Sequence, residues 1–183
     1  MLTRGRALRR IGDHGVAALA TSLCTNGALQ TLALQGNQVG PGGARQLAQA
    51  LKSNGALRAL DLSENPIGPP GASCVGMALC FNTGLRELRV RGCGAGDTGV
   101  GFLCEALRRH AALPHLGRGA LRLLDARDNG LSPEAARALA DAARGGAGAA
   151  PAELLVDCSP PLSPPAAGAG AAAGAPAALR VAV

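Results

Sequence analysis

The chain has 183 residues and a net charge of +6, and its composition is 48% apolar but only 1% aromatic. With Trp and Tyr absent, the sequence excludes a large aromatic core and a platform on which nucleic-acid bases could stack. The cations gather weakly between Arg4 and Arg10 and elsewhere alternate with Asp and Glu, which argues against a nucleic-acid partner.

Residues 1–10 are predicted to be a basic segment that replaces a repeat strand. The apolar residues that follow keep the helical register of later copies: Ile11, Val16, Leu19 and Leu23. An Arg-rich start before apolar residues also resembles a secretory signal, but the shared register favours half a repeat. We therefore expect a fragment or short isoform, with a genuinely short protein as an equal alternative. No apolar run reaches the ~18 residues that a membrane span needs.

Four later segments share one leucine pattern, which predicts a strand in each. They begin 28, 28 and 36 residues apart, at Leu29, Leu57, Leu85 and Leu121. In the copy LRALDLSENPIG, Leu60 and Leu62 stand two residues apart, so both point to the same face of an extended backbone. The ninth place of each copy is predicted to form the turn after the strand: Asn37, Asn65, Cys93 and Asn129.

A helix is predicted after each turn, because apolar residues recur there at spacings of three and four. Ala44, Leu47 and Leu51 show this pattern in one copy, and Pro41 stands where the helix should begin. Strands that alternate with helices imply a parallel sheet with right-handed crossovers. The predicted fold class is α/β: a leucine-rich repeat solenoid in the form of a short horseshoe, with parallel strands on the concave side and helices on the convex side.

The repeats are expected to cover residues 11–143, about four and a half copies, with an insertion at 108–119. The insertion is predicted to lengthen a helix or to form a loop at the rim. Its two histidines, His110 and His115, are interpreted as exposed polar residues rather than ligands, because no acid or thiol stands near them in the sequence.

Beyond the repeats, residues 144–158 are predicted to be a Gly/Ala linker with one last edge strand that uses Leu154 and Val156. Residues 159–183 are rich in Ala, Pro and Gly and contain one charged residue, Arg180. Such residues offer little area to offset the entropy of ordering, so we predict a disordered tail of low complexity. An Ala-rich helix near its end is the alternative.

Polar residues between and after the inward leucines should line up across the concave wall, on strands about 4.8 Å apart. They are the predicted partner-binding residues: Asp61, Ser63, Arg89, Arg91, Asp125 and Arg127. Two interpretations stay open. The charges neutralise one another between strands, which stabilises an exposed sheet by up to about 1 kcal/mol a pair, or they form a strip that recognises another macromolecule.

The sequence predicts no catalytic, cofactor-binding or metal-binding residues. Gly94 to Gly99 matches GxGxxG between a strand and a helix, but other copies have the same Gly-rich junction and the expected acidic residue is missing. The six cysteines contain no CxxC pair, so a metal site is not expected. Cys24 and Cys80 follow inward leucines and are predicted to be small buried groups with reduced thiols, as in an intracellular protein.

The LxxLxLxxN pattern, the 28-residue step and the Gly-rich turn into an AxxLxxxL helix resemble the ribonuclease-inhibitor-like leucine-rich repeats over residues 11–143. Members of this group include ribonuclease inhibitor, the C-terminal regions of NOD-like receptors and Ran GTPase-activating protein. The resemblance implies that Asn37, Asn65 and Asn129 bond the backbone of stacked turns, with Cys93 as a substitute.

The repetition without a catalytic constellation predicts a non-catalytic, cytoplasmic protein-protein interaction module or scaffold, which binds another protein through its concave face. The alternatives are a GTPase-activating or regulatory leucine-rich repeat protein, and a C-terminal fragment of a NOD-like receptor.

Overall fold

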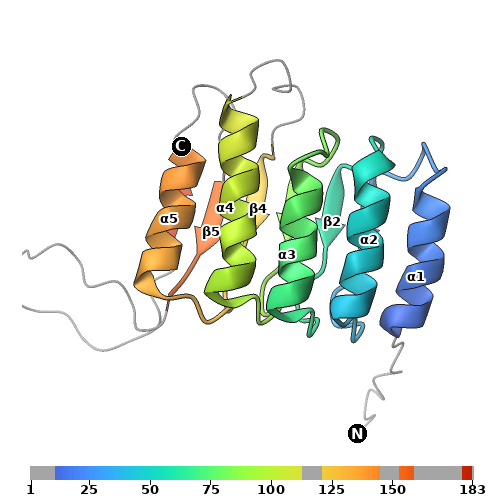
Figure 1. Cartoon of the computed structure of the whole chain (residues 1–183), viewed down its shortest axis with the longest axis horizontal. Coiled ribbons are helices and arrows are strands. Elements are labelled where there is room, and N and C mark those ends of the chain that lie inside the picture. Colours follow the sequence, from blue (N-terminus) through green and yellow to red (C-terminus); the bar gives the residue numbers. More distant parts are fainter. Residues whose placement is uncertain (1–10, 113–120, 145–152, 159–178, 183) are drawn as a thin grey trace, which may run out of the picture.

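Helices and strands alternate along almost the whole of the described chain (Figure 1). The computed structural model describes residues 11–112, 121–144, 153–158 and 179–182. The helices are α1 Gly12–Leu23, α2 Pro41–Ser53, α3 Gly68–Leu79, α4 Gly96–Ala112 and α5 Pro133–Arg144. The strands are β1 Thr31–Ala33, β2 Ala59–Asp61, β3 Glu87–Arg89, β4 Leu123–Asp125, β5 Glu153–Val156 and β6 Leu179–Ala182.

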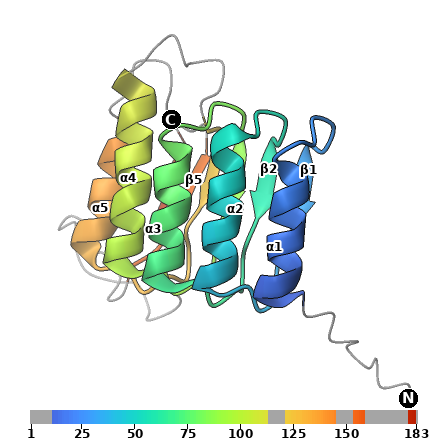
Figure 2. The ribbon, with the colours of Figure 1, turned by 45° about the vertical axis from the view of Figure 1, so that its right-hand side comes forward.

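The strands form one sheet in sequence order, β1 to β6, and the first five are parallel. Their central leucines are register partners along one row: Leu32, Leu60, Leu88, Leu124 and Leu154. All five helices cover the same face of the sheet (Figure 2). The predicted α/β leucine-rich repeat solenoid is therefore confirmed. We call the helix-free face of the sheet the open face.

The core is a single layer of aliphatic side chains between the strands and the helices. Leu60 and Leu62 of one repeat are fully buried, together with Ala72, Val75 and Leu79 from the helix that follows. Burying one Leu side chain contributes roughly 2 kcal/mol, so the repeats need no aromatic residues. The helices also approach closely because small residues face the neighbouring helix: a Cβ atom on Gly76 would lie 2.7 Å from the Phe102 backbone.

The turns after the strands are joined by buried asparagine amides. The side-chain oxygen of Asn65 accepts hydrogen bonds from the backbone N–H groups of Asn37 and Val39 in the preceding repeat, at 2.9 and 3.0 Å. Its amide nitrogen donates to the carbonyl oxygens of Leu34 and Leu62, both at 2.8 Å. Asn65 thus supplies donors and acceptors to backbone groups that no strand or helix satisfies.

Asn129 makes the equivalent bonds two copies later, to Cys93, Ala95 and Val90. Cys93 takes the asparagine position between them, and its thiol donates to the carbonyl oxygen of Leu62 at 3.1 Å. Burial raises the pKa of the Cys93 thiol to about 11, so the S–H donor persists at neutral pH. The first copy, Asn37, donates only to the carbonyl of Gln35 among these contacts.

A second row of buried side chains lies where each helix passes into the next strand. Asn54 donates to the carbonyl oxygen of Leu23 at 2.7 Å, and Asn82 donates to that of Leu51 at 2.6 Å. Each oxygen also accepts two backbone N–H groups of its own junction. This second row therefore joins the end of each helix to the end of the preceding helix. The turn asparagines join the turns after the strands, at the opposite end of the repeat, in the same way.

His110 occupies the next place in this second row, 28 residues after Asn82. The prediction that it is an exposed polar residue is wrong: it is 6% exposed, and its Nε2 lies 2.8 Å from the carbonyl oxygen of Leu79. Because a carbonyl only accepts, Nε2 carries the proton in this contact. The first residues of the predicted insertion continue α4 to Ala112, while His115 lies outside the described residues.

The C-terminal part of the sheet differs from the expectation of a last edge strand and a disordered tail. β5 includes the expected Leu154 and Val156, but β6 pairs with it antiparallel, so β5 is not an edge. The tail prediction is wrong for residues 179–182, because an added strand satisfies backbone groups that β5 would otherwise expose. Residues 1–10, 145–152 and 159–178 lie outside the described residues.

Replacing Asn65 by Ala should lower the free energy of unfolding by about 3 kcal/mol, because several buried backbone groups of two repeats lose their partners. Urea unfolding at neutral pH measures the change. Asn37→Ala is the matched control, since Asn37 is less buried and makes one such bond. Equal losses in the two variants would contradict a joining role for Asn65.

We expect the wild-type chain to lose stability in mild acid because of His110, and the variant His110→Asn to avoid that loss. Burial lowers the pKa of His110 and its hydrogen bond to Leu79 only partly offsets this. The unfolded chain therefore binds the proton first, and the native state loses stability as the pH falls below about 6.5.

Thermal unfolding of the wild type, His110→Asn and the control His14→Asn, at about pH 7.5 and about pH 5, tests this. His14 is exposed on α1. The wild type and His14→Asn should lose more stability in acid than His110→Asn does. The same loss in all three chains would show that His110 does not titrate as proposed.

Candidate functional site

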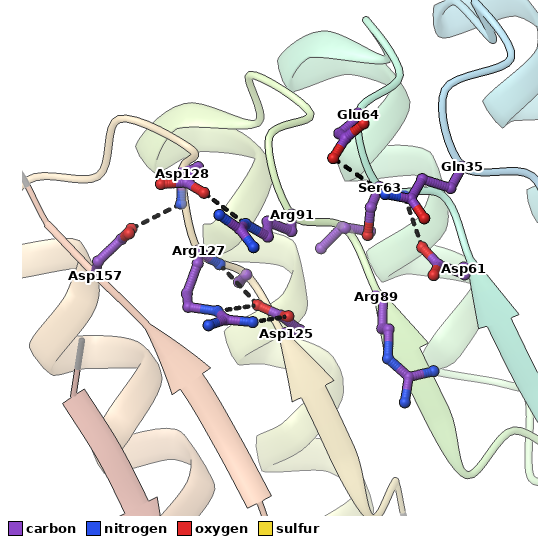
Figure 3. A network of polar contacts seen from close by, with 12 residues as sticks. Gln35, Asp61, Ser63, Glu64, Arg89, Arg91, Asp125, Arg127, Asp128 and Asp157 are labelled. Carbon is purple, nitrogen blue, oxygen red and sulfur yellow. Dashed lines mark hydrogen bonds and ion pairs between the residues drawn. The ribbon is translucent and has the colours of Figure 1, made fainter. Parts of the chain in front are cut away.

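The open face carries two rows of mostly polar residues where the strands end (Figure 3). The first row follows the strand register: Ala33, Asp61, Arg89, Asp125 and Leu155. The second row lies two residues further along each chain segment: Gln35, Ser63, Arg91, Arg127 and Asp157. Parallel pairing therefore brings all six predicted partner-binding residues onto one face.

Asp125 and Arg127 form the most buried pair of this face. The guanidinium of Arg127 donates to both carboxylate oxygens of Asp125, at 2.9 and 2.6 Å, and the Asp125 side chain is only 7% exposed. Burial would raise the pKa of Asp125, but the hydrogen bonds and charge of Arg127 outweigh it and leave that pKa below its ordinary value. Asp125 is thus a structural partner of Arg127 more than a surface charge.

Two contacts join neighbouring repeats through the residue just before the turn asparagine. Arg91 donates to Asp128 at 2.5 Å, and Gln35 donates to Glu64 at 3.0 Å. The backbone N–H of Asp128 also donates to the carboxylate of Asp157 at 2.8 Å. The Arg91–Asp128 pair is about half exposed on both sides.

Arg89 and Asp61 are register partners, yet each bonds within its own strand segment. Arg89 lies 3.1 Å from Glu87, and Asp61 accepts the backbone N–H of Ser63 at 2.9 Å. The arginines of this face are therefore paired with acids, but the partners differ from the cross-strand pairs between Arg89 or Arg91 and Asp61 or Asp125 that the sequence suggested. Ser63 is buried, which leaves it little surface to offer.

Glu64 and Asp128 were not among the predicted site residues. Both have a left-handed backbone, with φ of 58° and 57°, at the repeat position where Gly36 and Gly92 stand in the other copies. A non-glycine residue costs roughly 1 kcal/mol there. The signal available in the sequence was this alternation of Gly with an acid immediately before the turn residue.

The glycine motif Gly94 to Gly99 serves packing and turn geometry. The N–H of Gly96 already donates to the carbonyl oxygen of Asn129 at 3.1 Å. A Cβ atom on Gly99 would lie 2.7 Å from the Cβ of Ala72, so the glycine lets α3 and α4 approach. The backbone N–H of Gly96 is therefore not available to bind a phosphate, and the motif no longer supports a nucleotide site.

Among the described residues, no three His, Cys, Asp or Glu side chains come together as metal ligands. The six cysteines are free thiols. The prediction that Cys24 is buried is wrong: it is exposed, and Cys80 is half-buried. Both follow the last buried leucine of a helix and turn their sulfur back to a carbonyl of the same helix, Ala20 or Gly76. None of the described helices is both long and apolar enough for a bilayer.

Comparison with known proteins agrees with this geometry. A family model described as Leucine Rich repeat matches residues 28–48 and 56–76. No curated protein sequence matches the chain. The solved structure "Leiomodin-1 Actin-Binding Site 2 (ABS2)" is similar with a TM-score of 0.57 and 19% identity, over 73% of this chain and 72% of that one.

The tropomodulin C-terminal domain of Caenorhabditis elegans is similar with a TM-score of 0.58 and 15% identity, over 75% of this chain and 78% of that one. At these identities the likeness is one of fold. Together with the two matched repeats, it supports the leucine-rich repeat fold.

Replacing Asp125 by Asn should lower the free energy of unfolding by about 2 kcal/mol at neutral pH, because a buried bidentate ion pair loses one partner. The pKa of Asp125 is lowered in the folded chain, so its contribution is present above about pH 4 and disappears as the pH falls through the folded value. Urea unfolding at neutral and strongly acidic pH measures both effects.

Asp141→Asn is the control, because the Asp141–Arg144 pair is exposed on α5 and should contribute under about 0.5 kcal/mol. A pH-independent cost at Asp125 would mean that its charge is not what stabilises the pair.

Proposed function

We propose that this chain is a non-catalytic, cytoplasmic interaction module that holds a protein partner on its open face, and that it is of the ribonuclease-inhibitor-like kind. The observation that carries the proposal is the exposure of Arg89 and Arg91, whose side chains are 37% and 49% exposed on a face that none of the described helices covers. Exposed ion pairs stabilise a fold by less than about 1 kcal/mol, so a partner's carboxylates can replace Glu87 and Asp128 at little cost.

The six predicted residues take different parts in this proposal. Arg89, Arg91 and Asp61 supply charges that a partner can reach, because each is at least partly exposed. Arg127 and Asp125 hold the end of β4 in place through their buried pair, and the backbone N–H of Ser63 donates to Asp61 in the turn after β2. Recognition and self-neutralisation then belong to different pairs of the same face. The GTPase-regulator and NOD-like-receptor interpretations remain sequence-based alternatives.

Exchanging two charges on the open face tests the proposal. The chain and its Arg89→Glu, Arg91→Glu variant serve as baits in an affinity capture, with actin as one defined candidate because one similar structure is described as an actin-binding site. The control is Arg45→Glu, Arg137→Glu, which makes the same charge change at exposed positions of α2 and α5.

We expect the open-face variant, Arg89→Glu, Arg91→Glu, to recover at least about tenfold less of each partner than the unchanged chain does. The helix-face variant, Arg45→Glu, Arg137→Glu, should recover the same amount as the unchanged chain. Circular dichroism and thermal unfolding of both variants confirm that the fold is intact. Capture that is unchanged in the open-face variant, or lost equally in both, would remove the open face as the binding surface.

A further inference from the structure

A row of arginines lies at the edge of the molecule where the strands begin. In Figure 1 the helices end and the strands start at the upper edge. In the sequence, none of the five segments that join a helix to the next strand contains Asp or Glu: 24–30, 54–58, 80–86, 113–122 and 145–152. Several acids lie where strands end and helices begin, as Asp61, Asp125, Asp128 and Asp97 do, whereas Glu87 and Glu153 are the first residues of β3 and β5.

Three arginines stand next to one another on this edge, one at the start of each of three adjacent strands. Arg86 donates its backbone N–H to the carbonyl of Arg58 at 2.7 Å, and Arg122 donates to that of Arg86 at 2.6 Å. We call Arg58, Arg86 and Arg122 the arginine ladder. Backbone pairing fixes the strand spacing at about 4.8 Å, so the three side chains project from one row.

Within the described chain, no carboxylate forms an ion pair with a member of the arginine ladder. Arg58 donates to the carbonyl oxygen of Gly84 at 2.7 Å, which carries no net charge. Burial, and the positive charges of Arg122 and Arg58, lower the pKa of Arg86. Like charges on adjacent strands destabilise a sheet, so the fold by itself gains nothing from this row.

An exposed aromatic residue lies in the same junction as Arg86. Phe81 directly follows the last turn of α3 and is 61% exposed, the highest value among the large apolar residues of the described chain. The guanidinium of Arg109 lies 5.9 Å from the centre of its ring. Arg109 also pairs with Glu105 at 3.7 Å. Aromatic residues and arginine are both enriched in protein interfaces.

We propose that the arginine ladder and Phe81 form a second binding surface, which takes an acidic helical segment of a partner protein that also presents an apolar side chain. Carboxylates three or four residues apart on a helix are about 5–6 Å apart, close to the spacing of the ladder. A nucleic acid fits less well, because one phenyl ring is no platform for successive bases. The surface is separate from the open face, so this proposal goes beyond the proposed function.

Fluorescence anisotropy with defined probes tests the proposal on the full chain. The first probe is a labelled helical peptide with Glu at spacings of three and four residues and Leu beside them. The second has Gln in place of every Glu, and the third is a labelled oligothymidylate. We expect the Glu peptide to bind, the Gln peptide to bind at least about tenfold more weakly, and the oligothymidylate to bind no better than the Gln peptide.

The variant Arg86→Glu, Arg122→Glu should bind the Glu peptide at least about tenfold more weakly, because two attractions become repulsions. Arg58 stays unchanged because it bonds the Gly84 carbonyl. Phe81→Ser should bind the same peptide roughly threefold to tenfold more weakly, while the ratio of its affinities for the Glu and Gln peptides stays unchanged. The control variant is again Arg45→Glu, Arg137→Glu, which should leave the affinity within about twofold.

Three results would overturn the proposal. The Gln peptide binds as tightly as the Glu peptide, the oligothymidylate binds more tightly than either, or the helix-face control weakens binding as much as the ladder variant does. Circular dichroism guards against misfolding, and the ladder variant should be about as stable as the wild type, because positions 86 and 122 still repel each other while Arg58 gains an opposite charge beside it. The open-face variant Arg89→Glu, Arg91→Glu should still bind the Glu peptide, which keeps failure here distinct from failure of the proposed function.

Discussion

The buried amide of Asn65 illustrates the constraint on which the structure depends: each repeat must satisfy the backbone groups of its neighbour's turns. A turn between a short strand and a helix leaves N–H and C=O groups without partners, and burying them unpaired would cost several kcal/mol per repeat. Two rows of side chains, one at each end of the repeat, meet that requirement. Repeats can then stack only in one register, and the leucines of the core follow.

That register decides what surfaces the molecule can offer. Each position in the repeat becomes a row that runs across the sheet, so chemistry accumulates by repetition rather than by a pocket. One position yields the polar rows of the open face, and the position at the start of the strand yields the arginine ladder. The strand ends carry acids and arginines together, whereas arginine is the only charged residue type in the segments that join a helix to the next strand, so the charge is unevenly distributed.

Burial separates the charges that hold the fold from those available to a partner. Asp125 and Arg127 sit in a poorly hydrated place where their bidentate contact is strong, so they contribute to stability. Arg91 and Asp128 have a contact as short but remain about half exposed, where water competes and the net gain is small. Contacts of similar length in different surroundings therefore give one structural pair and one pair that we propose a partner displaces.

The spacing of leucines, asparagines and prolines was enough to predict the class of fold, the row of central leucines and the face that carries the polar rows, because the repeat period specifies where each backbone segment must lie. The same period placed His110 in line with Asn54 and Asn82, but its position in an apparent insertion hid that equivalence. The partners of Arg89 and Arg91, the burial of Ser63 and Asp125, and the added strand β6 were decided only by the tertiary structure. A period specifies backbone register, whereas a side chain selects among several donors or acceptors within reach of its rotamers, and that choice depends on contacts from other repeats that no spacing in the sequence encodes.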